Sequence, residues 1–141
     1  MMVKNSAINS YRQAASSEAM YATPFRLVQM LMTGALDGMA NARGSIIRKE
    51  HEARNNEIKW VISVIDALRG ALDFEQGGEI ANNLDMLYDY MIRRLFTANV
   101  EQDVDALDEV ISLLKEIKTA WDAMPEVIQN ASNIKDVVKD L

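Results

Sequence analysis

The stretch Gly77–Asn99, GGEIANNLDMLYDYMIRRLFTAN, constrains the fold most, because its apolar residues recur with the period of a helix. The two glycines permit a tight turn, and Glu79 then places a carboxylate in the first helical turn, where the helix dipole favours it. At 100° per residue, one arc of about 80° collects seven side chains. They are Ile80, Leu84, Leu87, Tyr88, Met91, Leu95 and Ala98. A single apolar face predicts a bundle helix that is buried on one side.

Composition limits the possible chemistry. The chain has 141 residues, of which 49% are hydrophobic, so one domain with one substantial core is expected. It contains no cysteine and one histidine, which excludes disulfides, thiolate sites and two-histidine zinc motifs. The net charge of −6 argues against nucleic acid as the main partner. No apolar run approaches the roughly 18 residues of a membrane span, and no secretory signal is visible. We therefore expect a cytoplasmic protein that neither inserts into membranes nor binds a cofactor.

Three further helices are expected around the Gly77–Asn99 helix. Thr23 and Pro24 start the first, which should run to about Arg48. The second should span about Glu57–Phe74, and the last begins after a capping Asp103 and ends before Pro125. The prediction is an all-α, antiparallel four-helix bundle over residues 24–124. An N-terminal arm (residues 1–23) precedes it, and a tail (residues 125–141) with a short amphipathic C-terminal helix follows it.

Two features point to close contacts. In the first helix, Gly34, Gly38 and Ala42 recur every four residues, so another backbone can approach closely there, whether internal or foreign. The second helix carries two apolar stripes, the second centred about 150° to 200° from the first at 100° per residue. This second stripe comprises Trp60, Val64, Ala67, Ala71 and Phe74. Either the helix is surrounded by its own chain, or the second stripe serves a partner or the tail.

The polar segment Lys49–Asn56 reads as an exposed loop, and it carries the single histidine, His51. An ordinary solvated histidine is the simple interpretation. The alternative is a phosphotransfer module, which would need His51 on a helix with a cation beside it, and Arg54 follows three residues later. No catalytic constellation or metal-ligand pattern is present.

Several residues suit contacts with other proteins. Tyr90 lies outside the apolar face of its helix and is an amphipathic contact group. Ile8 and Tyr11, three residues apart, can dock the N-terminal arm. The nine methionines suit an irregular core or a surface that grips helical partners. The tail places Val127, Ala131, Ile134, Val138 and Leu141 at heptad spacing, so it can pack in cis or on a neighbouring molecule.

The sequence also resembles a known family, the flagellar export chaperones that hold flagellin before secretion. GGEIANNLDMLYDYMIRRLFTAN is similar to the family's GGEIA-x-NL-x-x-LY-x-YM-x-RRL-x-x-AN run. ATPFRLVQMLMTGAL, INSYRQA and LDEVISLLKEIKTAW resemble three further family segments, in the same order along the chain. Met32-Thr33 departs from the family, which usually has an aromatic residue and an aspartate there, and so does Ala14, where valine is common.

The resemblance implies a non-enzymatic chaperone that binds the C-terminal segment of flagellin, prevents premature polymerisation and delivers flagellin to a component of the export gate. On this reading Trp60, Val64, Ala67 and Ala71 line the partner groove. Replacing Trp60 or Val64 with Asp is expected to abolish binding and to leave the fold helical. Ile8 and Tyr11 match the family's N-terminal motif, which is implied to occupy or border the groove. A self-associating bundle, a homodimer when empty, is the alternative from another class.

Overall fold

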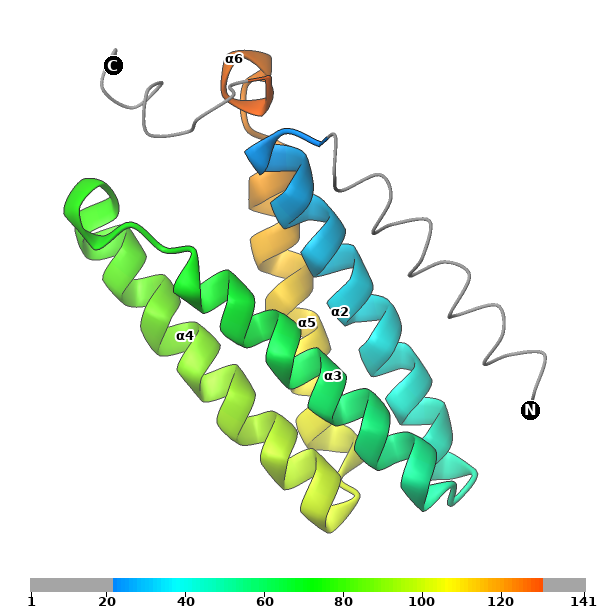
Figure 1. Ribbon diagram of the computed structural model, residues 1–141. Coiled ribbons are helices and arrows are strands. Elements are labelled where there is room, and N and C mark those ends of the chain that lie inside the picture. Colours follow the sequence, from blue (N-terminus) through cyan, green and yellow to red (C-terminus); the bar gives the residue numbers. More distant parts are fainter. Residues whose placement is uncertain (1–21, 131–141) are drawn as a thin grey trace. The chain divides into compact units, whose positions relative to one another are not determined.

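The computed structural model describes residues 22–130 (Figure 1). Leu31–Ala123 form one compact unit, and residues 22–30 and 124–130 belong to a second, so each is described by itself. Every regular element in the described range is a helix. The helices are α2 (Pro24–Ile47), α3 (His51–Gly70), α4 (Phe74–Glu101), α5 (Val104–Asp122) and α6 (Glu126–Gln129).

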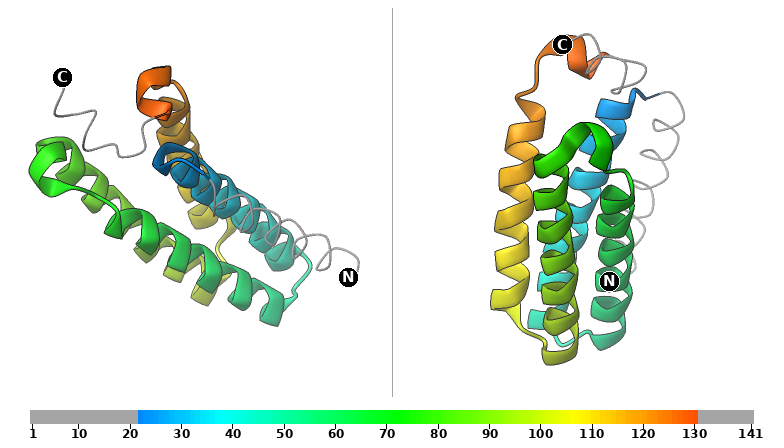
Figure 2. Two further views of the ribbon diagram at one scale, coloured as in Figure 1. Left: turned by 45° about the horizontal axis from the view of Figure 1, so that its top comes forward. Right: turned by 90° about the vertical axis from the view of Figure 1, so that its left-hand side faces the viewer.

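Within Leu31–Ala123, α3, α4, α5 and the larger part of α2 run antiparallel to their chain neighbours (Figures 1 and 2). Contacts between each adjacent pair define a closed ring. Gly38 of α2 lies against α3, and Arg69 of α3 is paired with α4. Arg94 of α4 is paired with α5, and Arg43 of α2 binds Asp108 of α5 through Nε–Oδ1 at 2.9 Å. The predicted all-α, antiparallel four-helix bundle is confirmed.

The core of this unit is made of the inward sides of its four helices. Fully buried large side chains come from each helix: Met32, Met39, Ile58, Val61, Ile65, Met91, Leu95, Leu107, Val110 and Leu114. Tyr88 is 3% exposed, as its position on the predicted apolar face requires. Burial of these side chains supplies the main stabilisation, at roughly 25 cal/mol per Å² of apolar surface removed from water.

Glycines on α2 let α3 approach closely. A Cβ atom built at Gly34 would lie 3.2 Å from the Trp60 ring. One built at Gly38 would lie 2.7 Å from Val61 Cγ2, 3.0 Å from Glu57 Oε1 and 3.2 Å from the Trp60 ring. The neighbour that the small residues of the first helix admit is therefore internal, and it is α3.

Three helix starts follow their sequence signals. The Thr23 hydroxyl accepts a hydrogen bond from Arg26 N at 3.2 Å, and Pro24 is the first residue of α2. Asp103 accepts from Asp105 N and Ala106 N, which confirms it as the cap of α5. Asp73 caps α4 in the same way, although the sequence analysis placed it inside the second helix. Short polar side chains at these positions satisfy N–H groups that have no partner within the helix.

The prediction of a loop over Lys49–Asn56 is wrong beyond Glu50, because α3 begins at His51. The extra turns carry no apolar face, so periodicity does not reveal them. Polar contacts to the end of α4 support them instead. Arg54 Nε donates to Asn99 Oδ1 at 3.0 Å, and Asn99 Nδ2 donates to Asn55 Oδ1 at 2.9 Å.

The boundary between the second and third predicted helices is also different. α3 ends at Gly70 rather than Phe74, and α4 begins at Phe74. Gly78 keeps a non-helical conformation, with φ 50° and ψ −123°, so a first turn meets the main helix at a kink. A positive φ favours glycine, as the Gly77-Gly78 pair suggested.

Ile80 was predicted on the buried face and is 72% exposed, so that prediction is wrong. Ala98, eighteen residues later, has the same helical angle and is 0% exposed. The predicted direction of the apolar face around α4 is therefore correct. Ile80 lies near the start of the helix, where neighbouring side chains do not cover it.

The tail can be compared only in part. After Pro125 the structure describes the four-residue helix α6, in which Gln129 Nε2 donates to the Met124 carbonyl at 2.6 Å. Ala131, Ile134, Val138 and Leu141 lie outside the described residues, and so do Ile8 and Tyr11 of the arm.

The α2–α3 contact leads to a matched pair of substitutions. Gly38→Ala places a methyl group within 2.7 Å of Val61 Cγ2, so we expect a loss of about 1–3 kcal/mol in the free energy of unfolding. Gly70→Ala meets nothing within 4 Å, so it should be neutral or stabilise by about 0.4–1 kcal/mol. Urea unfolding followed by circular dichroism measures both. Equal effects of the two substitutions would contradict the packing described here.

Candidate functional site

The predicted partner surface on α3 is the α3 strip, defined by Trp60, Val64, Ala67 and Ala71. The structure leaves Trp60 partly exposed, with its ring against Gly34 and Gly38 of α2. Ala67 lies in α3 and Ala71 is its C-terminal cap; both are exposed. The α3 strip thus contacts α2 through Trp60, and two of its four members are open to solvent.

Val64 is different, because it is only 7% exposed and belongs to the core. An aspartate there would bury a charge without a partner, which is strongly destabilising. Because Val64 is buried, we expect Val64→Asp to destabilise the fold, so it does not test binding alone. Ala67, which is exposed, is a better position for testing the α3 strip.

Tyr90 lies on another side of the bundle. Its hydroxyl donates to Glu109 of α5, and the guanidinium carbon of Arg93 lies 5.9 Å from the centroid of its ring. The hydrogen bond to Glu109 raises the pKa of Tyr90. Trp60 contacts α2 whereas Tyr90 contacts α5, so the structure does not bring Tyr90 together with the α3 strip.

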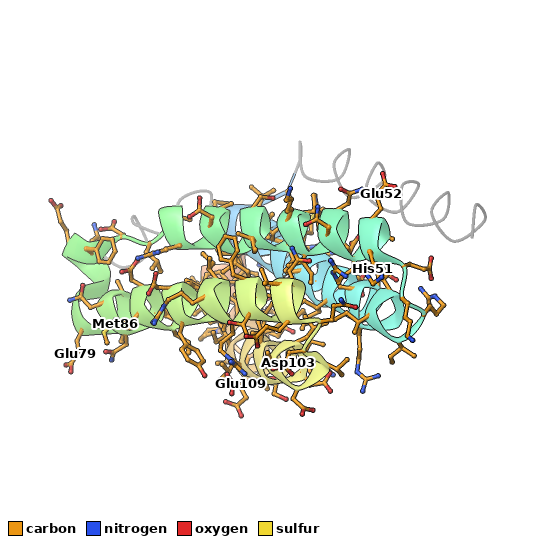
Figure 3. The ribbon with its side chains drawn as sticks, turned by 90° about the horizontal axis from the view of Figure 1, so that it is seen from below. His51, Glu52, Glu79, Met86, Asp103 and Glu109 are labelled. Atoms are coloured by element: carbon orange, nitrogen blue, oxygen red, sulfur yellow. The ribbon has the colours of Figure 1, made fainter. Side chains whose placement is uncertain are left out.

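The sequence predicts surplus apolar surface on the second helix, but much of the exposed apolar surface lies on α4. Large apolar side chains are exposed along this helix: Phe74 at 49%, Ile80 at 72%, Met86 at 69%, Phe96 at 54% and Val100 at 79%. Met86 is labelled on α4 in Figure 3, at some distance from His51 and Glu52 of α3. For Met86, Phe96 and Val100 the signal was present in the sequence, as apolar residues outside the predicted apolar face of the helix.

An ion-pair network joins α3 to α4 beside these surfaces. Arg69 Nε lies 2.6 Å from Asp85 Oδ1 and Nη2 lies 3.3 Å from Oδ2, a bidentate pair. Arg69 Nη1 also donates to Asp89 Oδ1 at 3.3 Å, and Arg93 Nε donates to Asp89 Oδ2 at 3.1 Å. Hydrogen bonding to Arg69 holds the pKa of Asp85 below its usual value.

His51 is exposed in the first turn of α3, with Nδ1 2.8 Å from Arg54 Nη1. A histidine on a helix with an adjacent cation is the arrangement that a phosphotransfer module would need. Arg54 is also bonded to Asn99, which makes it part of the contact between α3 and α4.

In the described range 22–130, no group of three or more His, Cys, Asp or Glu side chains is placed to hold a metal ion. None of the helices in this range is both long and apolar enough to cross a membrane. The fold and its surfaces therefore define a class: an all-α helical bundle that presents exposed apolar residues on its helix faces.

Comparison with known proteins then identifies the family. Residues 7–128 match the family model described as Flagellar protein FliS. The chain is 44% identical over 119 residues to the flagellar secretion chaperone FliSB of Pseudomonas aeruginosa, covering 84% of this chain and 94% of that protein. It is 42% identical over 122 residues to the flagellar secretion chaperone FliS of Salmonella typhimurium, covering 85% of this chain and 90% of that protein. For the flagellar secretion chaperone FliS of Vibrio cholerae the identity is 34% over 125 residues, covering 88% of this chain and 92% of that protein.

The chain belongs to the FliS family of flagellar secretion chaperones. This is a family of chaperones and not of enzymes, so the phosphotransfer alternative for His51 is not supported. The resemblance that the GGEIANNLDMLYDYMIRRLFTAN run predicted is confirmed.

The ion pair between Arg69 and Asp85 predicts a pH dependence. Because the folded-state pKa of Asp85 lies below the unfolded value of about 3.9, the pair stabilises the fold above that value. The contribution is lost as the pH falls through the folded-state pKa. Asp85→Asn should therefore lower the urea midpoint at pH 7 and low salt, by an amount that shrinks below about pH 3.9.

Asp66→Asn is the control, since Asp66 is an exposed α3 carboxylate without an ion pair in the described range. Its urea midpoint should follow that of the parent chain across the same pH range. If Asp85→Asn and Asp66→Asn shift the midpoint equally at every pH, the pair with Arg69 does not stabilise the contact between α3 and α4.

Proposed function

We propose that this chaperone binds the C-terminal segment of flagellin in the cytoplasm, prevents its premature polymerisation and delivers it to a component of the flagellar export gate. Membership in a family of flagellar secretion chaperones gives the class of client, a protein secreted through the flagellum. The single observation that carries the binding mode is the exposed part of the α3 strip, beside a tryptophan held against glycines of α2.

The chemistry of the client fits this surface. A terminal segment that assembles into a filament is apolar and amphipathic, and it must be covered before assembly. Coupled folding of such a segment costs about 2–5 kcal/mol or more, so the contact has to be long. A helix-in-groove arrangement, with apolar residues of the client at helical spacing, provides that length.

Small side chains determine how close the client can come. Ala67 and Ala71 are exposed and project little beyond the α3 backbone, while the Trp60 ring supplies a broad apolar contact. In this proposal Val64 supports the α3 strip from beneath, because it is buried. Ile8 and Tyr11, which lie outside the described residues, keep the client-binding role that the resemblance implies, and Tyr90 provides a separate contact on α4.

The proposal predicts that Ala67→Glu weakens flagellin binding by about tenfold or more, because a carboxylate would lose its hydration under the client helix. Ala67 is exposed in the free chain, so the fold should be unaffected. Co-purification and titration with full-length flagellin measure the effect, and flagellin without its C-terminal segment should not bind either form.

Ala120→Glu is the matched control, since Ala120 is an exposed alanine on α5 rather than α3. It should bind flagellin as the parent chain does, and both variants should keep their helical circular dichroism. Unchanged affinity of Ala67→Glu would place the client elsewhere. Retained binding of truncated flagellin would reject the C-terminal segment as the client.

A further inference from the structure

Phe74 is an exposed aromatic side chain at the end of the α3 strip. It is 49% exposed, although it is large and apolar. It follows Ala71, the last member of the α3 strip, by three residues, so the two Cα atoms lie within about 11 Å of each other. Trp60 is the first member of the strip, and the small Ala67 and Ala71 come between the two aromatic residues. The α3 strip is therefore bracketed by aromatic side chains.

The turn that carries Phe74 is stabilised by its own hydrogen bonds. The side chain of Asp73 accepts from Glu75 N and Gln76 N. The Asp73 carbonyl accepts from Gly77 N at 2.8 Å. These three bonds hold the turn together, but they do not set its direction. The kink that follows separates this turn from the main part of α4 (Figure 2).

Gly78 sets the direction of the turn. Its φ of 50° and ψ of −123° form a combination that glycine adopts and that residues with a Cβ resist. A Cβ built at Gly78 meets nothing within 4 Å, so the backbone conformation, and not lack of space, requires glycine. Beyond the kink, Asp85 of α4 is held by Arg69 of α3 at 2.6 Å. With both helices fixed there, the position of Phe74 depends on Gly78.

We propose that Phe74 is a second aromatic anchor for the flagellin segment, and that Gly78 is the positioning residue that holds it at the end of the α3 strip. This inference rests on the proposed function and adds a contact to the same site. The occupant is the same client helix, because the turn continues the surface which that helix covers. Aromatic side chains at an interface commonly carry a large share of the binding energy.

The dimensions suit a helical client. From Trp60 to Ala71 the α3 strip extends eleven residues, about 17 Å, which is about three turns of a client helix. Phe74 lies just beyond that length. A client helix that covers the strip therefore meets an aromatic group near each end, and covering Phe74 removes further apolar surface from water.

Removing the aromatic ring tests the anchor. We expect Phe74→Ala to weaken the binding of full-length flagellin by about tenfold. Phe96→Ala is the matched control, since Phe96 lies on the same helix and is 54% exposed. It should bind flagellin as the parent chain does. Titration with full-length flagellin measures both affinities, and circular dichroism checks that both variants remain helical.

A double-mutant cycle tests the positioning role. Alanine is strained at the backbone conformation of Gly78 and favours a continuous helix, which would move Phe74 away from the α3 strip. Gly78→Ala should therefore weaken flagellin binding about as much as Phe74→Ala. In a chain that already carries Phe74→Ala, adding Gly78→Ala should change the affinity no further. A residue with a merely structural role would weaken binding equally in both backgrounds.

Equal affinities of Phe74→Ala and Phe96→Ala overturn the anchor, and an equal loss from Gly78→Ala in both backgrounds overturns the positioning role. Ala67→Glu, titrated beside them, separates this inference from the proposed function. If Ala67→Glu weakens binding and Phe74→Ala does not, the α3 strip binds the client without Phe74. If flagellin without its C-terminal segment binds as well as the full-length protein, the proposed function fails and this inference fails with it.

Discussion

The close approach of α2 and α3 is the constraint on which the rest of the bundle depends. Gly34 and Gly38 leave room for the ring of Trp60, and Val61 fills the space against Gly38. Glycine inside a helix costs up to about 1 kcal/mol relative to alanine, so the packing has to offset that cost. With the two helices this close, the Trp60 ring packs against the α2 backbone, and the exposed alanines of the α3 strip follow it along α3.

α4 illustrates how one helix can serve two purposes. Its inner side supplies Tyr88, Met91 and Leu95 to the core, while Met86 and Phe96 remain exposed on its outer side. Arg69 holds α4 by Asp85 and Asp89, so the helix is fixed by ion pairs as well as by burial. Surface ion pairs contribute little stability individually. Here two of them share one arginine, so both act on the same contact between α3 and α4.

The sequence predicted what local chemistry determines. The helix starts at Pro24 and Asp103 were predicted correctly, and so was the family motif. Helix caps and the apolar period depend on residues that are neighbours in the chain. His51 was misplaced, since its helical turn is stabilised by contacts between α3 and α4 that no periodicity reveals. Ile80 and Val64 were misjudged for a related reason. The angular position of a residue around its helix can be derived from the sequence. Whether a neighbouring helix covers that residue, at its height along the helix axis, cannot be derived in this way.

Asp89 joins α4 to α3 through its ion pair with Arg69. One of its oxygens accepts from Arg69 of α3, and the other accepts from Arg93 of α4. A carboxylate held from both sides loses little further entropy when a new donor arrives, so it is preorganised for a charged contact. The α3 strip has small side chains and no such charge, which suits a long apolar client with an adaptable register.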